Sequence, residues 1–233
     1  MTRPKIYTLL TAAAVGALLG GGGVNVRRGA TALLERMPWL TLDTTSQSHR
    51  QLYVLCVAGW VLFSLYWEAA AMSAAAAKST ESRGSRSVHV LLVSVAQLLV
   101  LVPLRGLGRY LPVSTLIMTA GLTIQAIGTF VAVWARQHLG RNWSGAIAIK
   151  VEHQLIRSGP YRLLRHPIYT GLLAMYIGPA VVTGEWLALV GVALAALAYW
   201  RKIRLEEAAL DTAFGADYDA YRRATWALVP GLF

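Results

Sequence analysis

The chain has 233 residues, of which 56% are hydrophobic and only 14% are charged. Because an ordinary soluble domain carries roughly 25% charged residues, this composition exceeds what one soluble core can bury, and it excludes intrinsic disorder. The single cysteine, Cys56, excludes a disulfide scaffold. The net charge of +11 comes from basic residues that lie between apolar runs, which favours a polytopic membrane protein over nucleic-acid binding.

Uncharged apolar runs give the predicted elements in chain order, since a transmembrane helix needs about 20 such residues. These runs are residues 6–26, 51–67 with its continuation 69–77, 87–104, 110–135, 167–184 and 187–200. The first run has a second interpretation as a cleaved secretory signal, because Arg3 and Lys5 precede it. The last two runs are shorter and predict a helical hairpin. The sequence therefore predicts an all-α, polytopic integral membrane protein with about five to six transmembrane helices.

The positive charges predict how these spans are oriented. With six spans and a cytoplasmic N-terminus, 16 of the 22 Lys and Arg residues fall on the cytoplasmic side and 6 fall outside. Short cytoplasmic loops carry such an excess. Both termini are therefore expected in the cytoplasm, together with a connector at residues 136–166 and a C-terminal tail at residues 201–233.

The connector differs in composition from the spans around it. Residues 138–171 are rich in Gly, Pro, His, Arg and Tyr, and Gly159 with Pro160 is a turn signal. Pro167 suits the first turn of a helix and keeps His166 out of helical geometry. His166 is therefore expected just before a helix N-terminus at the membrane surface, where backbone N–H groups attract anionic groups.

Two segments together carry a longer motif. GPYRLLRHPIYTG at residues 159–171 is followed by RKIRLEEAALDTAFGADYDAYRR at residues 201–223. Over about the last 95 residues, this pattern resembles the isoprenylcysteine carboxyl methyltransferase family and its phospholipid methyltransferase relatives. The matching positions are His153, Leu155, Ile156, Gly159, Pro160, Tyr161, Arg165, His166, Pro167, Tyr169, Gly171, Glu206, Glu207, Leu210, Phe214, Gly215, Tyr218 and Tyr221.

The resemblance implies S-adenosylmethionine as methyl donor and a lipophilic small-molecule or lipidated acceptor that enters from the bilayer. The donor is expected between the connector and the helix that carries the two glutamates. Its binding residues are then His153, Leu155, Gly159, Tyr161, His166, Pro167, Tyr169 and Glu207. Membrane lipids are expected partners, whereas no nucleic acid and no metal site is predicted.

The same resemblance predicts how the chain is organised, and the composition predicts where it is located. Residues 1–135 would form N-terminal transmembrane helices, and residues 136–233 would form a catalytic region that includes the helical hairpin and the cytosolic connector and tail. The composition, rich in Ala, Gly and Arg, hints at a bacterium, so the expected location is a bacterial inner membrane.

Different acceptors would need different side chains for methyl transfer. A carboxylate acceptor needs a cation to hold it, and Lys202 and Arg165 are the candidates. An amine or hydroxyl acceptor needs a proton removed, and Glu206 is then the candidate base. Where the family usually has Arg four residues before the first glutamate, this chain has Lys202, which keeps the charge but loses the planar bidentate fork.

Two other functions stay open on the sequence. A membrane sterol-type reductase using NADPH has a similar tail, and VPGLF at residues 229–233 resembles its ending. The GPY turn directly before RHP and the short chain favour methyl transfer instead. A non-enzymatic membrane scaffold would not explain why polar residues concentrate in two segments on the same side.

Several polar residues also have purely structural interpretations. Lys202 and Glu206 are four residues apart, so on a helix they would form a surface ion pair. Trp143 is expected to be a membrane anchor, and Gln125 is expected to hydrogen-bond between helices. The remaining connector and tail arginines are expected to be topogenic charges or headgroup contacts: Arg157, Arg162, Arg222 and Arg223.

Overall fold

The computed structural model describes residues 46–72, 78–79, 82–103, 107–143, 148–149 and 155–231. The predicted first run at residues 6–26 lies outside these residues. The elements are α3 (Gln47–Met72), β1 (Lys78–Ser79), α4 (Arg83–Leu101), α5 (Thr115–Leu139), η2 (Gly140–Asn142), β2 (Ala148–Ile149), η3 (Gly159–Arg162), α6 (Pro167–Thr183), α7 (Trp186–Phe214) and α8 (Ala216–Ala224). The two-residue strands pair antiparallel, and the predicted all-α class is confirmed.

Most of these helices have the length and composition of membrane spans. Within the described residues, α3, α4, α5 and α7 are long and apolar enough to cross a membrane, and α6 is apolar but has only 17 residues. Large apolar side chains on the outer faces are exposed, among them Leu62, Leu91, Leu116 and Phe130. A surface of this kind is typical of contact with lipid. The chain is therefore a polytopic integral membrane protein, as predicted.

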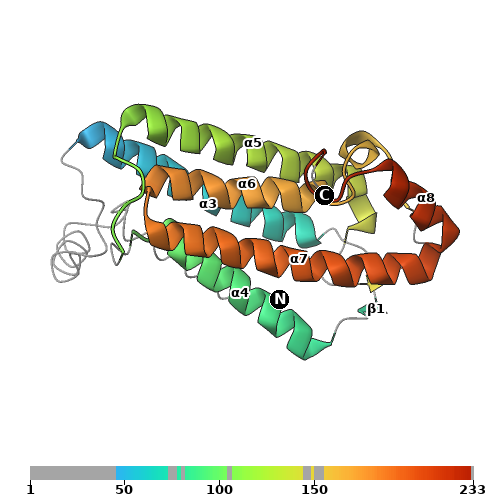
Figure 1. Ribbon diagram of the computed structural model, residues 1–233. Coiled ribbons are helices and arrows are strands. Elements are labelled where there is room, and N and C mark those ends of the chain that lie inside the picture. The colour runs from blue at the N-terminus through green and yellow to red at the C-terminus, as the bar shows by residue number, and fades with distance from the viewer. Residues whose placement is uncertain are drawn as a thin grey trace.

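The helices α3 to α7 run side by side, with α5 against α6 and α4 against α7 (Figure 1). Glycines allow the α5–α6 contact. A Cβ added at Gly171 would lie 2.6 Å from the backbone nitrogen of Ala132, and one added at Gly128 would lie 2.6 Å from the carbonyl oxygen of Gly171. Small residues of this kind let two helix backbones approach closely in a membrane.

A buried amide joins α5 to α3. The Nε2 atom of Gln125 donates a hydrogen bond of 2.8 Å to the carbonyl oxygen of Cys56, and both residues are buried. The predicted interhelical hydrogen bond of Gln125 is confirmed. Because few donors and acceptors exist inside such a bundle, this bond also fixes the register of the two helices.

α7 differs from the prediction because it does not end with the apolar run at residue 200. It continues to Phe214, since residues 201–213 are mostly good helix formers without Gly or Pro. At 1.5 Å per residue, its 29 residues extend roughly 44 Å, more than the ~30 Å hydrocarbon core. The second helix of the hairpin is therefore not short, and its last turns carry Lys202 and Glu206 past the apolar part.

One end of the bundle gathers the connector and the tail. In Figure 1, α5 ends, α6 begins and α8 lies at the right, whereas the turn between α6 and α7 lies at the left. The β1–β2 pair also joins the α3–α4 connection to the connector between α5 and α6. We call the end with η3 and α8 the connector end.

Candidate functional site

The turn η3 packs directly on the end of α5. Gly159 begins η3 with a φ of +57°, a conformation that side chains other than glycine rarely adopt. A Cβ there would lie 2.2 Å from the His138 ring. Tyr161, two residues later, is buried. The glycine of the GPY turn therefore serves both the backbone conformation and the close approach to α5.

The end of the tail pairs with the residues before α6. The backbone N–H groups of Arg165 and His166 donate to the carbonyl oxygens of Trp226 and Ala227 at 2.8 and 3.0 Å. The hydroxyl of Thr170 donates to the carbonyl oxygen of Leu228 at 2.7 Å. The predicted packing of the connector against the tail is confirmed, and it fixes the backbone of the RHP segment from both sides.

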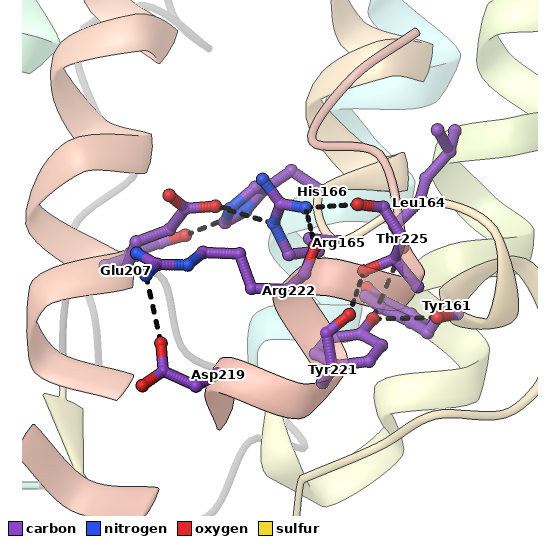
Figure 2. A network of polar contacts seen from close by, with 10 residues as sticks. Tyr161, Leu164, Arg165, His166, Glu207, Asp219, Tyr221, Arg222 and Thr225 are labelled. Atoms are coloured by element: carbon purple, nitrogen blue, oxygen red, sulfur yellow. Dashed lines mark hydrogen bonds and ion pairs between the residues drawn. The ribbon is translucent and has the colours of Figure 1, made fainter. Parts of the chain in front are cut away.

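Glu207 joins α7 to this segment. Its Oε1 atom accepts a hydrogen bond of 2.8 Å from Nε of Arg165 and lies 3.2 Å from Nε2 of His166 (Figure 2). The same guanidinium donates through NH1 to the carbonyl oxygens of Thr225 and Arg222. The Arg165 guanidinium therefore joins the start of α6 to α7 and to the tail.

Glu206 faces the same segment one position earlier on α7. Its Oε1 atom accepts a hydrogen bond of 2.6 Å from the hydroxyl of Tyr169, and its Oε2 atom lies 3.7 Å from Nδ1 of His166. The Tyr169 ring stacks between those of His166 and Tyr199, with centroid distances of 5.7 and 5.1 Å. The two carboxylates thus flank one imidazole, which belongs to a stack of three rings.

Two tyrosines of α8 close the site from the tail. The hydroxyl of Tyr221 donates to the carbonyl oxygen of Tyr161 at 2.7 Å. Burial raises the pKa of Tyr221 to about 12, so this hydroxyl keeps its proton. Burial, reinforced by the nearby Glu207 carboxylate, also raises the pKa of Tyr218. Both phenols therefore stay neutral beside the carboxylates.

The structure brings most of the predicted site residues together. Direct contacts join Arg165, His166, Tyr169, Glu206 and Glu207. Pro167 is the first residue of α6, Gly159 lies in η3, and Leu155 is half-buried before it. Lys202 is buried one turn before Glu206 on α7. Burial and the nearby Glu206 carboxylate raise the pKa of Tyr161. His153 lies outside the described residues. The catalytic and binding roles of these residues stay predictions.

Arg136, a basic residue at the start of the connector, is not singled out by the sequence motif. The side chain is 4% exposed, and it donates to the carbonyl oxygens of Gly140 and Ala70 at 3.0 and 2.7 Å. In the part of the chain that the structure describes, its buried Nε has no hydrogen-bond partner. The signal was in the helix period, because the buried positions of α5 recur every three or four residues up to 136.

The prediction for Trp143 as a membrane anchor is wrong. The side chain is buried at 8% exposure, and the Arg136 guanidinium lies 4.1 Å from its ring centroid. Its ring also packs edge-on against Trp67 of α3. A cation beside an aromatic face is stabilised by the ring quadrupole, so Trp143 belongs to the surroundings of Arg136.

Comparisons with known proteins find a family model and named relatives that match about half of this chain. A family model described as phospholipid methyltransferase matches residues 116–217. A probable protein-S-isoprenylcysteine O-methyltransferase of Oryza sativa subsp. indica is 34% identical over 113 residues, covering 47% of this chain and 59% of the relative. The protein-S-isoprenylcysteine O-methyltransferase of Schizosaccharomyces pombe is 29% identical over 118 residues, covering 48% of this chain and 49% of the relative.

A bacterial relative and a solved structure complete the comparison. The cobalt-zinc-cadmium resistance protein CzcN of Cupriavidus metallidurans is 33% identical over 121 residues, or 52% of each chain. The eukaryotic intramembrane Ras methyltransferase ICMT has a similar fold, with a TM-score of 0.59 at 16% identity over 99% of this chain and 87% of that one. The chain spans about half the length of the curated relatives it matches. The resemblance to the isoprenylcysteine carboxyl methyltransferase family is confirmed.

Proposed function

We propose that this chain is an integral-membrane methyltransferase that uses S-adenosylmethionine and acts on a lipophilic acceptor, with an isoprenylcysteine-type carboxylate as the leading candidate. One observation carries the proposal: the two halves of the motif meet through the Arg165–Glu207 and Tyr169–Glu206 contacts, 42 and 37 residues apart in the sequence. The names of the relatives favour methyl transfer over an NADPH-dependent reductase and over a non-enzymatic scaffold.

The two glutamates of the site carry negative charge, which complements the positive charge of this donor. S-adenosylmethionine carries a sulfonium cation and an α-amino group, and the Glu206 and Glu207 side chains stay 22% and 17% exposed. When bound, the donor supplies an electrophilic methyl group. We assign its binding to the motif residues His153, Leu155, Gly159, Tyr161, His166, Pro167, Tyr169 and Glu207. Tyr169, which donates to Glu206, also stacks on the ring of Tyr199.

A carboxylate acceptor is already deprotonated, so the chain must hold an anion rather than remove a proton. Lys202 is buried on the same helix as the two glutamates. Arg165 is basic too, but its guanidinium already donates to Glu207 and to two backbone carbonyls. We assign the anion to Lys202, because it is buried one turn before Glu206, and a positioning role to Arg165.

An amine or hydroxyl acceptor would give Glu206 a different role. Its Oε1 already accepts from the Tyr169 hydroxyl, while Oε2 lies 3.7 Å from His166. A carboxylate placed between a phenol and an imidazole has a path for the proton that it removes. Glu206 is the proposed base for such acceptors.

The proposed location is a bacterial inner membrane, with the connector end and both termini in the cytoplasm. The 16 to 6 distribution of positive charges supports this orientation. A polar donor would then enter from the cytosol, while the acceptor reaches Lys202 sideways from the bilayer. Its apolar tail would supply binding energy through burial.

Binding of S-adenosylhomocysteine and of NADPH to the detergent-purified protein, measured by titration calorimetry, separates the candidate functions. We expect saturable binding of S-adenosylhomocysteine and none of NADPH. NADPH binding alone would favour the reductase, and binding of neither would favour a scaffold. His166→Ala and Glu206→Ala should each weaken S-adenosylhomocysteine binding by about 1–3 kcal/mol. Each substitution removes one member of a buried polar contact and leaves the other member without a hydrogen-bond partner. Unchanged affinity in both variants would contradict the donor placement.

Turnover of an S-farnesylated cysteine analogue tests the acceptor. If the acceptor is a carboxylate, Lys202→Arg should retain or raise methyl-ester formation, because the charge is kept and a planar fork is gained. Lys202→Gln should lose it. Equal loss in both variants would remove Lys202 from the role of anion holder. Equal rates on water-soluble S-methylcysteine would contradict a lipophilic acceptor.

A further inference from the structure

A pocket of about 260 Å³ lies between η3 and α8, beside the candidate site. We call it the η3–α8 pocket; its lining residues are Arg157, Arg162, Ala220, Tyr221, Ala224 and Thr225. Neither glutamate of the site lines it, nor do His166 and Tyr169. The Tyr221 and Thr225 hydroxyls already donate to the carbonyl oxygens of Tyr161 and Tyr221. The charge of the lining therefore comes from Arg157 and Arg162 and is that of an anion site.

Within the part of the chain that the structure describes, no carboxylate pairs with either arginine of the pocket. Arg157 donates from NH2 to the carbonyl oxygen of Asp217 at 2.9 Å, and its guanidinium lies 5.7 Å from the Tyr221 ring centroid. These contacts orient the Arg157 side chain and leave its positive charge in place. Among the described residues, neither Arg157 nor Arg162 forms an ion pair, whereas neighbouring Arg222 pairs with Asp219 at 2.9 Å. Two positive charges therefore face one small pocket.

Apolar residues next to the pocket indicate where its ligand comes from. Leu163 follows Arg162 and is 53% exposed, and Trp226 follows Thr225 and is 44% exposed. The backbone N–H of Trp226 donates to the carbonyl oxygen of Leu163 at 3.0 Å, so the two residues are adjacent in space. An exposed tryptophan beside arginines is typical of the membrane–water interface. Leu163 and Trp226 therefore give the rim of the pocket an exposed apolar surface of the kind found at that interface.

We propose that the η3–α8 pocket binds the phosphate of an anionic phospholipid, with Arg157 and Arg162 as donors and with Leu163 and Trp226 against the adjoining acyl chains. A guanidinium group donates two parallel N–H bonds to phosphate oxygens. The acyl chains add apolar burial that inorganic phosphate lacks. The net positive charge of the two arginines favours a lipid with a net negative charge over a zwitterionic one, and the acyl chains favour a lipid over the free ion.

The pocket shares residues with the candidate site. Tyr221, which lines the pocket, donates its hydroxyl to the carbonyl oxygen of Tyr161. Thr225 lines it too and accepts from the Arg165 guanidinium through its backbone carbonyl. A lipid bound across η3 and α8 therefore stabilises the same contacts that hold the connector against the tail. The inference itself concerns lipid binding and does not depend on the proposed function.

Native mass spectrometry of the full-length protein in detergent, titrated with phosphatidylglycerol or phosphatidylcholine, tests the proposal. We expect Arg157→Gln/Arg162→Gln to weaken the first phosphatidylglycerol binding event at least tenfold. The matched control Arg83→Gln/Arg86→Gln removes the same charge from exposed arginines of α4 and should weaken it less than twofold. Equal weakening in both variants, or equally tight phosphatidylcholine binding, would overturn the proposal.

A second variant probes the pocket without removing a basic side chain. Ala220→Glu adds a carboxylate at an exposed position of the pocket wall, so it should fold normally and show the same tenfold loss. Unchanged phosphatidylglycerol binding in this variant would overturn the placement.

Two further measurements distinguish an anionic phospholipid from a free phosphate ion and from the methyl donor. Inorganic phosphate at 10 mM should leave the melting temperature unchanged, whereas phosphatidylglycerol should raise it. Equal stabilisation by phosphate would overturn the lipid assignment in favour of a free anion. Loss of S-adenosylhomocysteine binding in the Arg157→Gln/Arg162→Gln variant would assign the pocket to the methyl donor instead and overturn the proposal. Unchanged S-adenosylhomocysteine binding there is the expected result.

Discussion

Glu207 is the residue through which α7 holds the start of α6. Its carboxylate accepts from Arg165 and lies beside His166, and the Glu207 and Arg165 side chains are only 17% and 10% exposed. An ion pair shielded from water in this way depends on both partners, because loss of one strands the charge of the other. Glu206, one position earlier, makes its hydrogen bond with the neutral Tyr169 instead.

Replacing this carboxylate should therefore destabilise the fold. Glu207→Gln is expected to lower the free energy of unfolding by about 1–3 kcal/mol, because the Arg165 guanidinium loses its ion-pair partner in a shielded place. The matched control is Asp219→Asn, which breaks an exposed ion pair with Arg222 and should cost less than about 1 kcal/mol. Unfolding of the purified variants in one detergent, followed by circular dichroism, measures both; equal losses would contradict the role of Glu207.

The raised pKa of Tyr221 predicts that the stability of the fold depends on pH. Burial raises its pKa from 10.0 to about 12, against the opposing effect of Arg165 and Arg157. Because the folded state has the higher pKa, the stability from this phenol is complete below pH 10 and is lost as the pH rises through 12. Tyr221→Phe has no such proton, so its melting temperature should fall less than that of the wild type between pH 10 and 12. Parallel curves would contradict the assignment.

α5 and α6 form the most extensive described helix contact, and their glycines face each other. The carbonyl oxygen of Gly128 would lie 2.6 Å from a Cβ at Gly171, and the carbonyl oxygen of Gly121 would lie 2.6 Å from one at Gly178. Such contacts leave no room for a methyl group. α6 begins with the RHP segment, so this packing also fixes the position of the candidate site relative to α5.

A single methyl group should therefore separate these helices. Gly171→Ala is expected to cost about 1–3 kcal/mol of stability through overpacking. Gly84→Ala in α4 is the matched control, because a Cβ there meets nothing within 4 Å and alanine favours the helix. Titration with sodium dodecyl sulfate measures both variants. Comparable stability of the two would show that α5 and α6 separate without cost.

The predicted division of the chain after residue 135 stays a prediction. α5 runs through this position to Leu139 without a break and packs along α6. The second helix of the hairpin, α7, also packs against α4. Elements on the two sides of residue 135 thus pack in one bundle. Residues 136–233 produced alone would lose these packing contacts.

At the scale of the whole molecule, the two ends of the bundle differ in chemistry. The connector end holds the paired carboxylates, Arg136 and the η3–α8 pocket. The positive-charge distribution predicts that this end faces the cytoplasm. Exposed residues at each end, Asp217 of α8 and Leu107 before α5, can report on this orientation.

Cysteine labelling in intact bacterial cells measures the topology. The native Cys56 is buried, so background labelling should be low. A membrane-impermeant maleimide is expected to label Leu107→Cys and to label Asp217→Cys only after the cells are permeabilised. Labelling of Asp217→Cys from outside would reverse the orientation and move the proposed donor site away from the cytosol.

The sequence by itself determined the membrane class, the described apolar spans, the start of α6 at Pro167 and the segments that form the site. These features follow from local physics. A membrane span depends on about 20 apolar residues in succession, and proline at the first turn depends only on its own ring and its missing N–H. The motif supplied the partners Arg165, His166, Glu206 and Glu207 without their geometry.

Tertiary structure alone decided which of these residues meet. The pairing of Arg165 with Glu207, rather than Glu206, depends on how α7 is rotated against α6. The helix period marks Arg136 as buried, but its contact with Trp143 depends on how α3 and α5 pack around the two residues. The η3–α8 pocket likewise exists only where the tail folds back on the connector. Contacts between distant segments depend on packing, which composition and periodicity do not specify.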